Sequence, residues 1–424
     1  VRPLRLMTSM LCVRRLPPNI LLFVTSFDIL FDENFQYPTV YSTLKVFDEL
    51  YIGFFFIIAI FKNKQREFKT LVFIFILFLI GTVGNFKNHS AFTTVILGAY
   101  STIKPMLLYW SLAQYNFVWK DFHKLRKLIC AIFPLVVVSY ILDLAIPSFR
   151  SDIGIISQAV EIRMGLRSLG GFFNRFTVAT LYALLFYIFY KFYDKDKVSK
   201  IKIFFSDFMF LASFKIKDIL GFMLARSFYL FKRFKAKYIV IIASIIYLLF
   251  LLYANLMPEH YNEYFNSGED SNVARVVLSY TSIRILKDYF PFGVGWGLFA
   301  SPTSQQIQSP IYARYGIDDI YGLSYQNDNG VFMSDTFWPM ILGETGFLGT
   351  IVYLYILYLV FWPFVSNFFI DNRDRKYIMP AFLFIAFLGF SVGKPVFTGP
   401  PHSLVLWGFA GLFYSLKNTT YEVK

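Results

Sequence analysis

Long apolar runs alternate with short polar segments along almost the whole chain. A helix that crosses a bilayer needs about 20 mostly apolar residues, and 12 runs approach that length. The predicted spans are residues 18–31, 44–61, 70–86, 93–113, 128–147, 173–190, 203–214, 219–231, 238–257, 337–365, 377–396 and 401–416. The pattern therefore predicts an all-α integral membrane protein with about 12 transmembrane helices.

The seventh and eighth runs are predicted to be two short helices rather than one long helix. One helix through both runs would place Lys215, Lys217 and Asp218 near the middle of the bilayer. A charge at that depth costs about 3 kcal/mol, so a break with a polar junction is favoured.

Further along, Lys394 and His402 flank the last external turn, where either could line a cavity or lie at the interface.

Basic residues are concentrated on alternate connections between the spans. These connections are residues 62–66, 120–127, 191–202, 232–237 and 373–376, together with the N-terminal segment. They hold roughly three times as many Lys and Arg as the opposite set, and the positive-inside rule then places both termini in the cytoplasm. The net charge of +14 follows from this topology and from attraction to anionic lipid. No nucleic-acid partner is needed to explain it.

Composition excludes a soluble domain with an anchor. Hydrophobic residues make up 56% of the chain, charged residues only 16%, and the mean hydropathy is +0.53, whereas soluble domains carry about 25% charged residues. The two cysteines, Cys12 and Cys130, are far apart and offer neither a disulfide framework nor a zinc site. The first apolar stretch lacks a small-residue cleavage site, so we expect no cleavable signal peptide.

The largest non-membrane segment is predicted at residues 258–335. It divides the chain into transmembrane helices 1–9 (1–257), a large external loop (258–335), and transmembrane helices 10–12 with the C-terminus (336–424). The loop contains nine Asp and Glu but only four Lys and Arg. External loops of this length in compact proteins usually carry function.

Arginines on the two largest external segments, residues 148–172 and 258–335, are the main candidates for ligand binding. Arg163 and Arg167 are four positions apart, so a helix would present both on one face. Arg275 and Arg284 lie in residues 273–290, whose spacing predicts an amphipathic helix resting on the membrane surface. Guanidinium groups bind phosphate through two N–H groups, which would suit a lipid-linked diphosphate. The alternative is that these side chains only reach toward lipid headgroups.

A glycine-rich turn, residues 291–297, follows that helix. It has no βαβ unit around it and lacks the spacing of a dinucleotide-binding loop. Gly293 and Gly295 would let a substrate approach the backbone closely, or they would serve a purely structural turn with positive φ.

Four motifs occur in an order and topology that resemble the Wzy-type O-antigen and capsule polymerases, which share a family with the O-antigen ligases. They are an Arg-Gly-Asn stretch from Arg163 to Asn174, a Ser-x-basic motif at Ser213, an Arg-containing helix ending in the glycine turn, and a segment from Asp335 to Gly349 that opens a helix. The family's Pro-Asn pair is absent because Arg175 follows Asn174.

The resemblance implies a GT-C-like fold and glycosyl transfer at the periplasmic face of the bacterial inner membrane. The growing glycan would leave undecaprenyl diphosphate for a hydroxyl of a lipid-linked repeat unit, without a metal or nucleotide cofactor. Arg275 and Arg284 would stabilise the leaving diphosphate, and Asp335 would be the catalytic base or, alternatively, a helix N-cap. Implied partners are the carrier-linked oligosaccharide, membrane lipid and a chain-length regulator protein.

Other functions remain open from the sequence. Ligases of the family place a His where this chain has Asp335, which favours a polymerase. A flippase or other transporter would show inverted repeats and midplane charges, and a scaffold is a third alternative. The external tyrosines could stack on sugars or form an interfacial belt. They are Tyr312, Tyr315, Tyr321 and Tyr325.

Overall fold

The structure of the chain is a computed structural model. It describes residues 38–61, 67–155, 162–163, 166–193, 199–230, 255, 262, 273–325, 332–370 and 374–416. The predicted span 18–31, nearly all of the span 238–257, the basic connections 62–66 and 232–237, and the start of the large loop lie outside the described residues.

Most of the described residues are helical, and the β-structure among them is one pair of two-residue strands. The helices of ten residues or more are α3 (Pro38–Phe61), α4 (Phe68–Lys87), α5 (Phe92–Ala113), α6 (Trp119–Ala145), α8 (Phe176–Ile188), α9 (Lys200–Ala212), α10 (Ile216–Leu230), α13 (Ala274–Asp288), α16 (Trp338–Ile370), α17 (Arg375–Phe390) and α18 (His402–Ser415). Among the described residues, four helical stretches are long and apolar enough to cross a membrane: α4, α6, α16 and residues Phe176–Tyr193, where α8 continues into the π-helix η2 (Phe189–Tyr193). The helical prediction is confirmed there, and the total of 12 spans stays a prediction.

The predicted break in the seventh and eighth runs is confirmed. Helix α9 ends at Ala212 and α10 begins at Ile216. Between them Phe214 has φ of 47°, a left-handed conformation that an α-helix cannot continue through.

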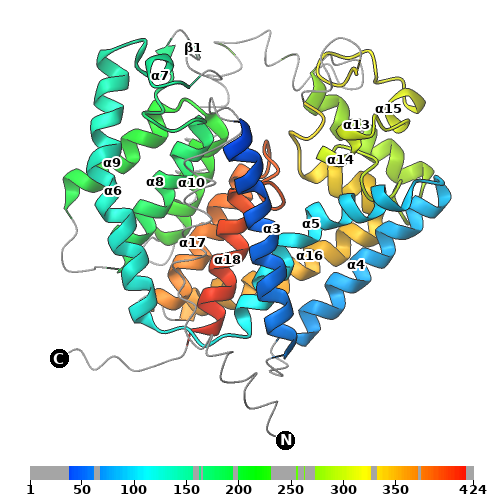
Figure 1. Cartoon of the computed structure of the whole chain (residues 1–424), viewed down its shortest axis with the longest axis horizontal. Helices are drawn as coiled ribbons and strands as arrows, with labels where there is room; N and C mark the ends of the chain where they lie inside the picture. Colours follow the sequence, from blue (N-terminus) through cyan, green and yellow to red (C-terminus); the bar gives the residue numbers. More distant parts are fainter. Residues whose placement is uncertain are drawn as a thin grey trace, which may run out of the picture. The chain divides into compact units, whose positions relative to one another are not determined.

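The chain divides by its internal contacts into two units, and this division differs from the three consecutive segments predicted above. Unit 1 comprises residues 1–57, 115–215 and 412–424. In it, α8 packs on both α6 and α9, and Figure 1 shows the three helices in the same part of the unit. The rings of Phe133 and Phe186 stack with centroids 3.7 Å apart, and the Ser206 hydroxyl donates to the Ala183 carbonyl at 3.0 Å.

Arg163 and Arg167 lie on a short hairpin in unit 1, so the expectation that a helix would present them on one face is wrong. Strand β1 (Ile162–Arg163) pairs antiparallel with β2 (Leu166–Arg167). In this register Arg163 is opposite Leu166 and Arg167 is opposite Ile162. The two arginines therefore occupy successive cross-strand pairs, which alternate between the faces of a sheet.

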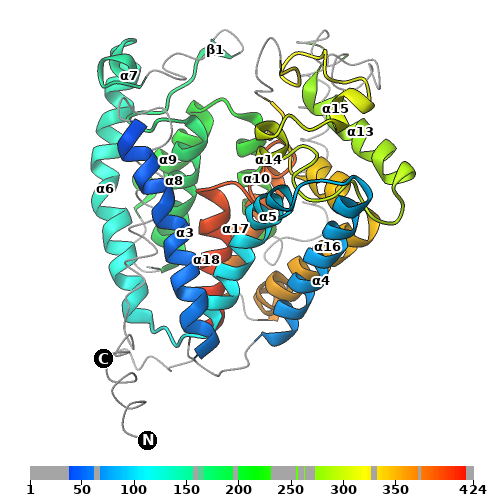
Figure 2. The same cartoon turned by 45° about the vertical axis from the view of Figure 1, so that its right-hand side comes forward.

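Unit 2 comprises residues 58–114 and 216–411. Here α16 packs on α4, α13 and α17, and α10 packs on α17. Figure 2 shows α4 beside α16, with α13 followed by the short helices α14 (Pro302–Gln306) and α15 (Ile311–Arg314). The indole of Trp296 lies against Gly81 of α4 and donates its N–H to the Phe78 carbonyl at 3.0 Å. This anchors the large loop to α4.

Helix α13 (Ala274–Asp288) confirms that most of residues 273–290 is helical, and its contact with a membrane surface stays a prediction. Its inner face is buried at Val277, Leu278 and Ile285. On the outer side, Tyr280 and Ile283 are exposed large hydrophobic residues, as expected for a helix resting on a membrane surface.

Candidate functional site

Five charged side chains from four segments of unit 2 form a cluster, which we call the charged cluster. Lys217 and Asp218 lie in the first turn of α10, and Arg275 lies in the first turn of α13. Asp335 lies just before α16, and Lys394 follows α17. Packing of α10 on α17 and of α13 on α16 brings these segments together.

Arg275 and Asp335 form an ion pair, with 2.5 Å between Nη2 and Oδ2. Their side chains are 36% and 37% exposed, so a ligand can reach the pair. The Nε of Arg275 is buried and makes no hydrogen bond to any residue that the structure describes. An unused donor on a guanidinium is costly in a folded protein unless a ligand or water satisfies it.

The alternative role of Asp335, as the N-cap of the helix that follows it, does not fit the structure. Helix α16 begins at Trp338, and its first main-chain hydrogen bond runs from the Ile341 amide to the Phe337 carbonyl. The N-cap position therefore belongs to Phe337, two residues after Asp335.

Lys394 and Asp218 form a second, buried ion pair. Lys394 Nζ lies 2.5 Å from Asp218 Oδ1, and the side chains are 8% and 0% exposed. Charges this deeply buried persist only when they are paired. Asp218 also lies in the first turn of α10, where the helix dipole favours a carboxylate.

Lys217 is half-buried and donates a hydrogen bond to the Gly393 carbonyl. It precedes the predicted span 219–231 and lies outside the four stretches that could cross a membrane. Burial, together with the charges of Arg275 and Lys394, lowers the pKa of Lys217 to about 7, while Asp218 and Asp335 oppose the shift. These surroundings favour the neutral amine over the ammonium group.

Arg284 is not part of the charged cluster, although the sequence paired it with Arg275. The two residues are nine positions apart on α13, which is about two and a half turns, or 13 Å along the axis, and puts them on opposite faces. The Arg284 guanidinium lies 5.2 Å from the centre of the Tyr315 ring. The Tyr315 hydroxyl donates to Asp288 at 2.7 Å, and burial together with this carboxylate raises the pKa of Tyr315.

The glycine turn packs against α16, which favours the structural interpretation of Gly293 and Gly295. The amides of Val294 and Gly295 donate to the carbonyls of Gly343 and Glu344 at 2.9 and 3.0 Å. A Cβ on Gly293 would lie 2.2 Å from the Gly343 carbonyl oxygen. The space that these glycines leave is therefore filled by a helix backbone, and not by a substrate.

Three of the four external tyrosines belong to the interior of the large loop. Tyr312 is fully buried and its hydroxyl accepts the Ala300 amide at 2.9 Å. Tyr315 is 8% exposed, and the Tyr325 hydroxyl donates to the Ser304 carbonyl. Tyr321, at 72% exposed, is available for stacking on a sugar.

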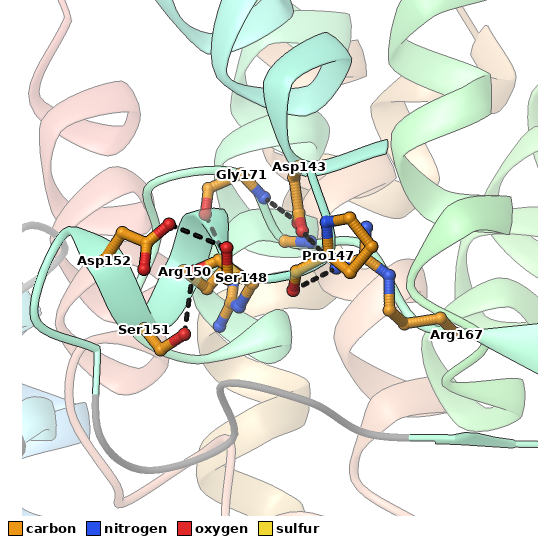
Figure 3. A network of polar contacts seen from close by, with 9 residues as sticks. Asp143, Pro147, Ser148, Arg150, Ser151, Asp152, Arg167 and Gly171 are labelled. Atoms are coloured by element: carbon orange, nitrogen blue, oxygen red, sulfur yellow. Dashed lines mark hydrogen bonds and ion pairs between the residues drawn. The ribbon is translucent and has the colours of Figure 1, made fainter. Parts of the chain in front are cut away.

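Arg167 in unit 1 has protein partners of its own. Its guanidinium lies 3.2 Å from Asp143 and donates to the Pro147 carbonyl at 2.9 Å (Figure 3). Asp143 is fully buried and also accepts the amides of Gly170 and Gly171 at 2.8 and 2.9 Å. The arrangement holds the loop before α8 to the end of α6. The side chain of Arg163 lies outside the described residues.

The same loop contains a buried arginine that the sequence did not single out. Arg150 of the short helix α7 (Phe149–Asp152) is fully buried and donates to the carbonyls of Gly171 and Asn174, each at 3.1 Å. Its guanidinium lies 4.5 Å from the centre of the Phe176 ring. No periodic pattern marks this position, because its partners are main-chain carbonyls more than 20 residues away.

Replacing Asp143 with Asn is expected to destabilise unit 1. One oxygen of the amide can still accept both backbone amides, as Oδ2 does now, but an NH2 group replaces the charged oxygen that faces Arg167. Loss of one partner of a buried ion pair costs about 3 kcal/mol. The thermal unfolding midpoint of the purified protein in detergent should fall by several degrees. Asp152→Asn is the control, since Asp152 is exposed and its carboxylate accepts a hydrogen bond from the Ser148 hydroxyl at the surface. Equal midpoints for the two variants would show that the Asp143 contacts are not stabilising.

A scan of known protein-family models and a search of curated proteins found no match to this chain.

Proposed function

We propose that the protein is a membrane glycosyltransferase that polymerises O-antigen or capsule repeat units. It transfers the growing glycan from undecaprenyl diphosphate to a hydroxyl of a lipid-linked repeat unit at the periplasmic face of the bacterial inner membrane. The observation that carries the proposal is Arg275, a partly exposed guanidinium near Lys217 and Lys394 whose Nε–H has no hydrogen-bond partner among the described residues.

The bond between the glycan and the diphosphate is already activated in the donor. The main task left to the enzyme is therefore to stabilise the diphosphate as it leaves. Negative charge develops on the departing diphosphate, and preorganised cationic donors stabilise it most in the transition state. Asp335 holds Arg275 through one nitrogen, so the ion pair orients the guanidinium while leaving other N–H groups for phosphate oxygens. Lys394, held in turn by Asp218, adds positive charge to the same cluster.

The position of α13 also supports a lipid-linked substrate. Arg275 lies at the start of this helix, and exposed Tyr280 and Ile283 follow on its outer side. With this apolar side on the membrane, the first turn of α13 would lie at headgroup depth, where the diphosphate of a carrier lipid resides.

The proposal is tested by supplying the purified protein, reconstituted in liposomes, with undecaprenyl-diphosphate-linked repeat units as both donor and acceptor. We expect a ladder of carrier-linked products that grows by whole repeat units without added metal or nucleotide. A deletion strain should correspondingly display single repeat units on its surface lipid. Long carrier-linked polymer in that strain would favour a ligase, and absence of any ladder from intact substrate would refute the polymerase.

A further inference from the structure

We propose that Lys217 is the catalytic base that takes the proton from the acceptor hydroxyl. This inference rests on the proposed function and assigns the proton-transfer step to a residue of the charged cluster. It replaces Asp335 as the candidate for that step.

The position of Lys217 suits a base that must be held in place. Its Nζ donates to the Gly393 carbonyl, and one N–H used in this way orients the lone pair of a neutral amine. Gly393 also makes room for the side chain, because a Cβ there would lie 2.9 Å from Lys217 Cδ and 3.4 Å from Nζ. Lys217 is only half-buried, so an acceptor hydroxyl can approach it.

The surroundings of Lys217 favour its neutral form. Burial is the largest effect, and the positive charges of Arg275 from α13 and Lys394 from the segment after α17 add to it, because both disfavour an ammonium group at Lys217. The N-terminus of α10 adds partial positive charge at the same place. Asp218 and Asp335 oppose these effects, yet each is already paired, with Lys394 and Arg275 respectively. A pKa near 7 matches the operating pH, which is the condition for an efficient general base.

The carboxylates of the cluster are less suited to this step. Asp218 is fully buried against Lys394. Asp335 Oδ2 lies 2.5 Å from the guanidinium of Arg275, and this contact serves to orient the guanidinium. Asp335 is therefore a positioning residue for Arg275.

The step balances without a further reactant. The acceptor oxygen forms a bond to the anomeric carbon of the growing glycan while its proton moves to Lys217 Nζ. The bond between that carbon and the diphosphate oxygen breaks, and its electron pair leaves with the diphosphate. The new ammonium group stands beside the leaving anion, and it releases its proton to water when the carrier diphosphate departs.

The test uses the full-length protein in liposomes, with initial rates at saturating substrate across about two pH units on either side of pH 7. The wild-type rate should rise about tenfold per pH unit below 7 and level off above it. Lys217→Met and Lys217→Arg should lose activity by roughly 100-fold or more at every pH, while binding of undecaprenyl diphosphate is retained. Lys287→Met, at an exposed lysine of α13, is the control and should match wild type.

A second variant separates a base from a merely structural lysine. Lys217→Cys, made in a protein whose Cys12 and Cys130 are replaced by Ala, is treated with 2-bromoethylamine to restore an amine. Because the sulfur withdraws electrons, the restored amine is less basic than that of lysine. The rising part (limb) of the pH–rate profile should therefore lie at lower pH than in the wild type. A wild-type rate in Lys217→Met, or a limb that does not move in the aminoethylated protein, would overturn the inference. Either result would leave the polymerase intact, whereas failure of the wild-type protein to form a ladder would refute the polymerase itself.

Discussion

Replacing Arg275 with Lys is expected to reduce polymer formation by roughly 100-fold, the usual effect of removing one transition-state donor. Lysine keeps the positive charge and can still pair with Asp335, but it loses the planar group that can bind phosphate through two N–H groups. The protein should insert and accumulate normally, because the ion pair is partly exposed and contributes little to stability. The measurement is the amount and length of carrier-linked polymer per unit of membrane protein.

Arg284→Lys is the matched control. It makes the same substitution on the same helix, but Arg284 lies on the opposite face, against Tyr315. Polymer from this variant should remain close to wild type. Equal losses from both variants would show that the two arginines act together or that both serve lipid headgroups. Full activity of Arg275→Lys would remove the central support for diphosphate binding at the charged cluster.

Local features of the fold could be predicted from the sequence because they depend on nearby residues. The apolar runs at 70–86 and 128–147 correspond to α4 and α6, since length and hydropathy alone identify such helices. The break between α9 and α10 followed from the cost of placing Lys215 and Asp218 in mid-bilayer. The charge count on the connections predicts the sidedness of the chain.

The candidate site could be predicted only in part because its members come from distant segments. Arg275 and Asp335 were each identified from a motif, but their pairing joins positions 60 residues apart. Lys217 was recognised only as a polar residue at a helix junction. Its altered pKa depends on Arg275 and Lys394, and no local pattern encodes their approach.

For Arg163 and Arg167, the secondary structure predicted from their spacing is wrong. A four-residue spacing fits a helix, but it fits a tight hairpin equally well, and only the register of β1 and β2 separates the two. Arg167 then finds its partner in Asp143, 24 positions earlier. A spacing argument therefore holds only after the secondary structure is known.

Replacing Gly293 with Ala is expected to destabilise unit 2 by about 3 kcal/mol or more, the upper range for overpacking. The added methyl would lie 2.2 Å from the Gly343 carbonyl oxygen and 2.5 Å from the Glu344 carbonyl carbon. Both are backbone atoms of a helix and cannot rotate away as a side chain could. Relief requires the turn to separate from α16, which would break the hydrogen bonds that Val294 and Gly295 donate to it.

Gly316→Ala separates this collision from simple backbone strain. Gly316 has φ of 65°, and a Cβ there meets no atom within 4 Å, so the expected cost is only the penalty for a left-handed residue, about 1 kcal/mol. The thermal unfolding midpoint in detergent should therefore fall much further for Gly293→Ala than for Gly316→Ala. If Gly293→Ala unfolded at the wild-type temperature, the turn would not be packed on α16 as described. Gly293 would then again be a candidate for close approach of the substrate, because its open side would face something other than a helix.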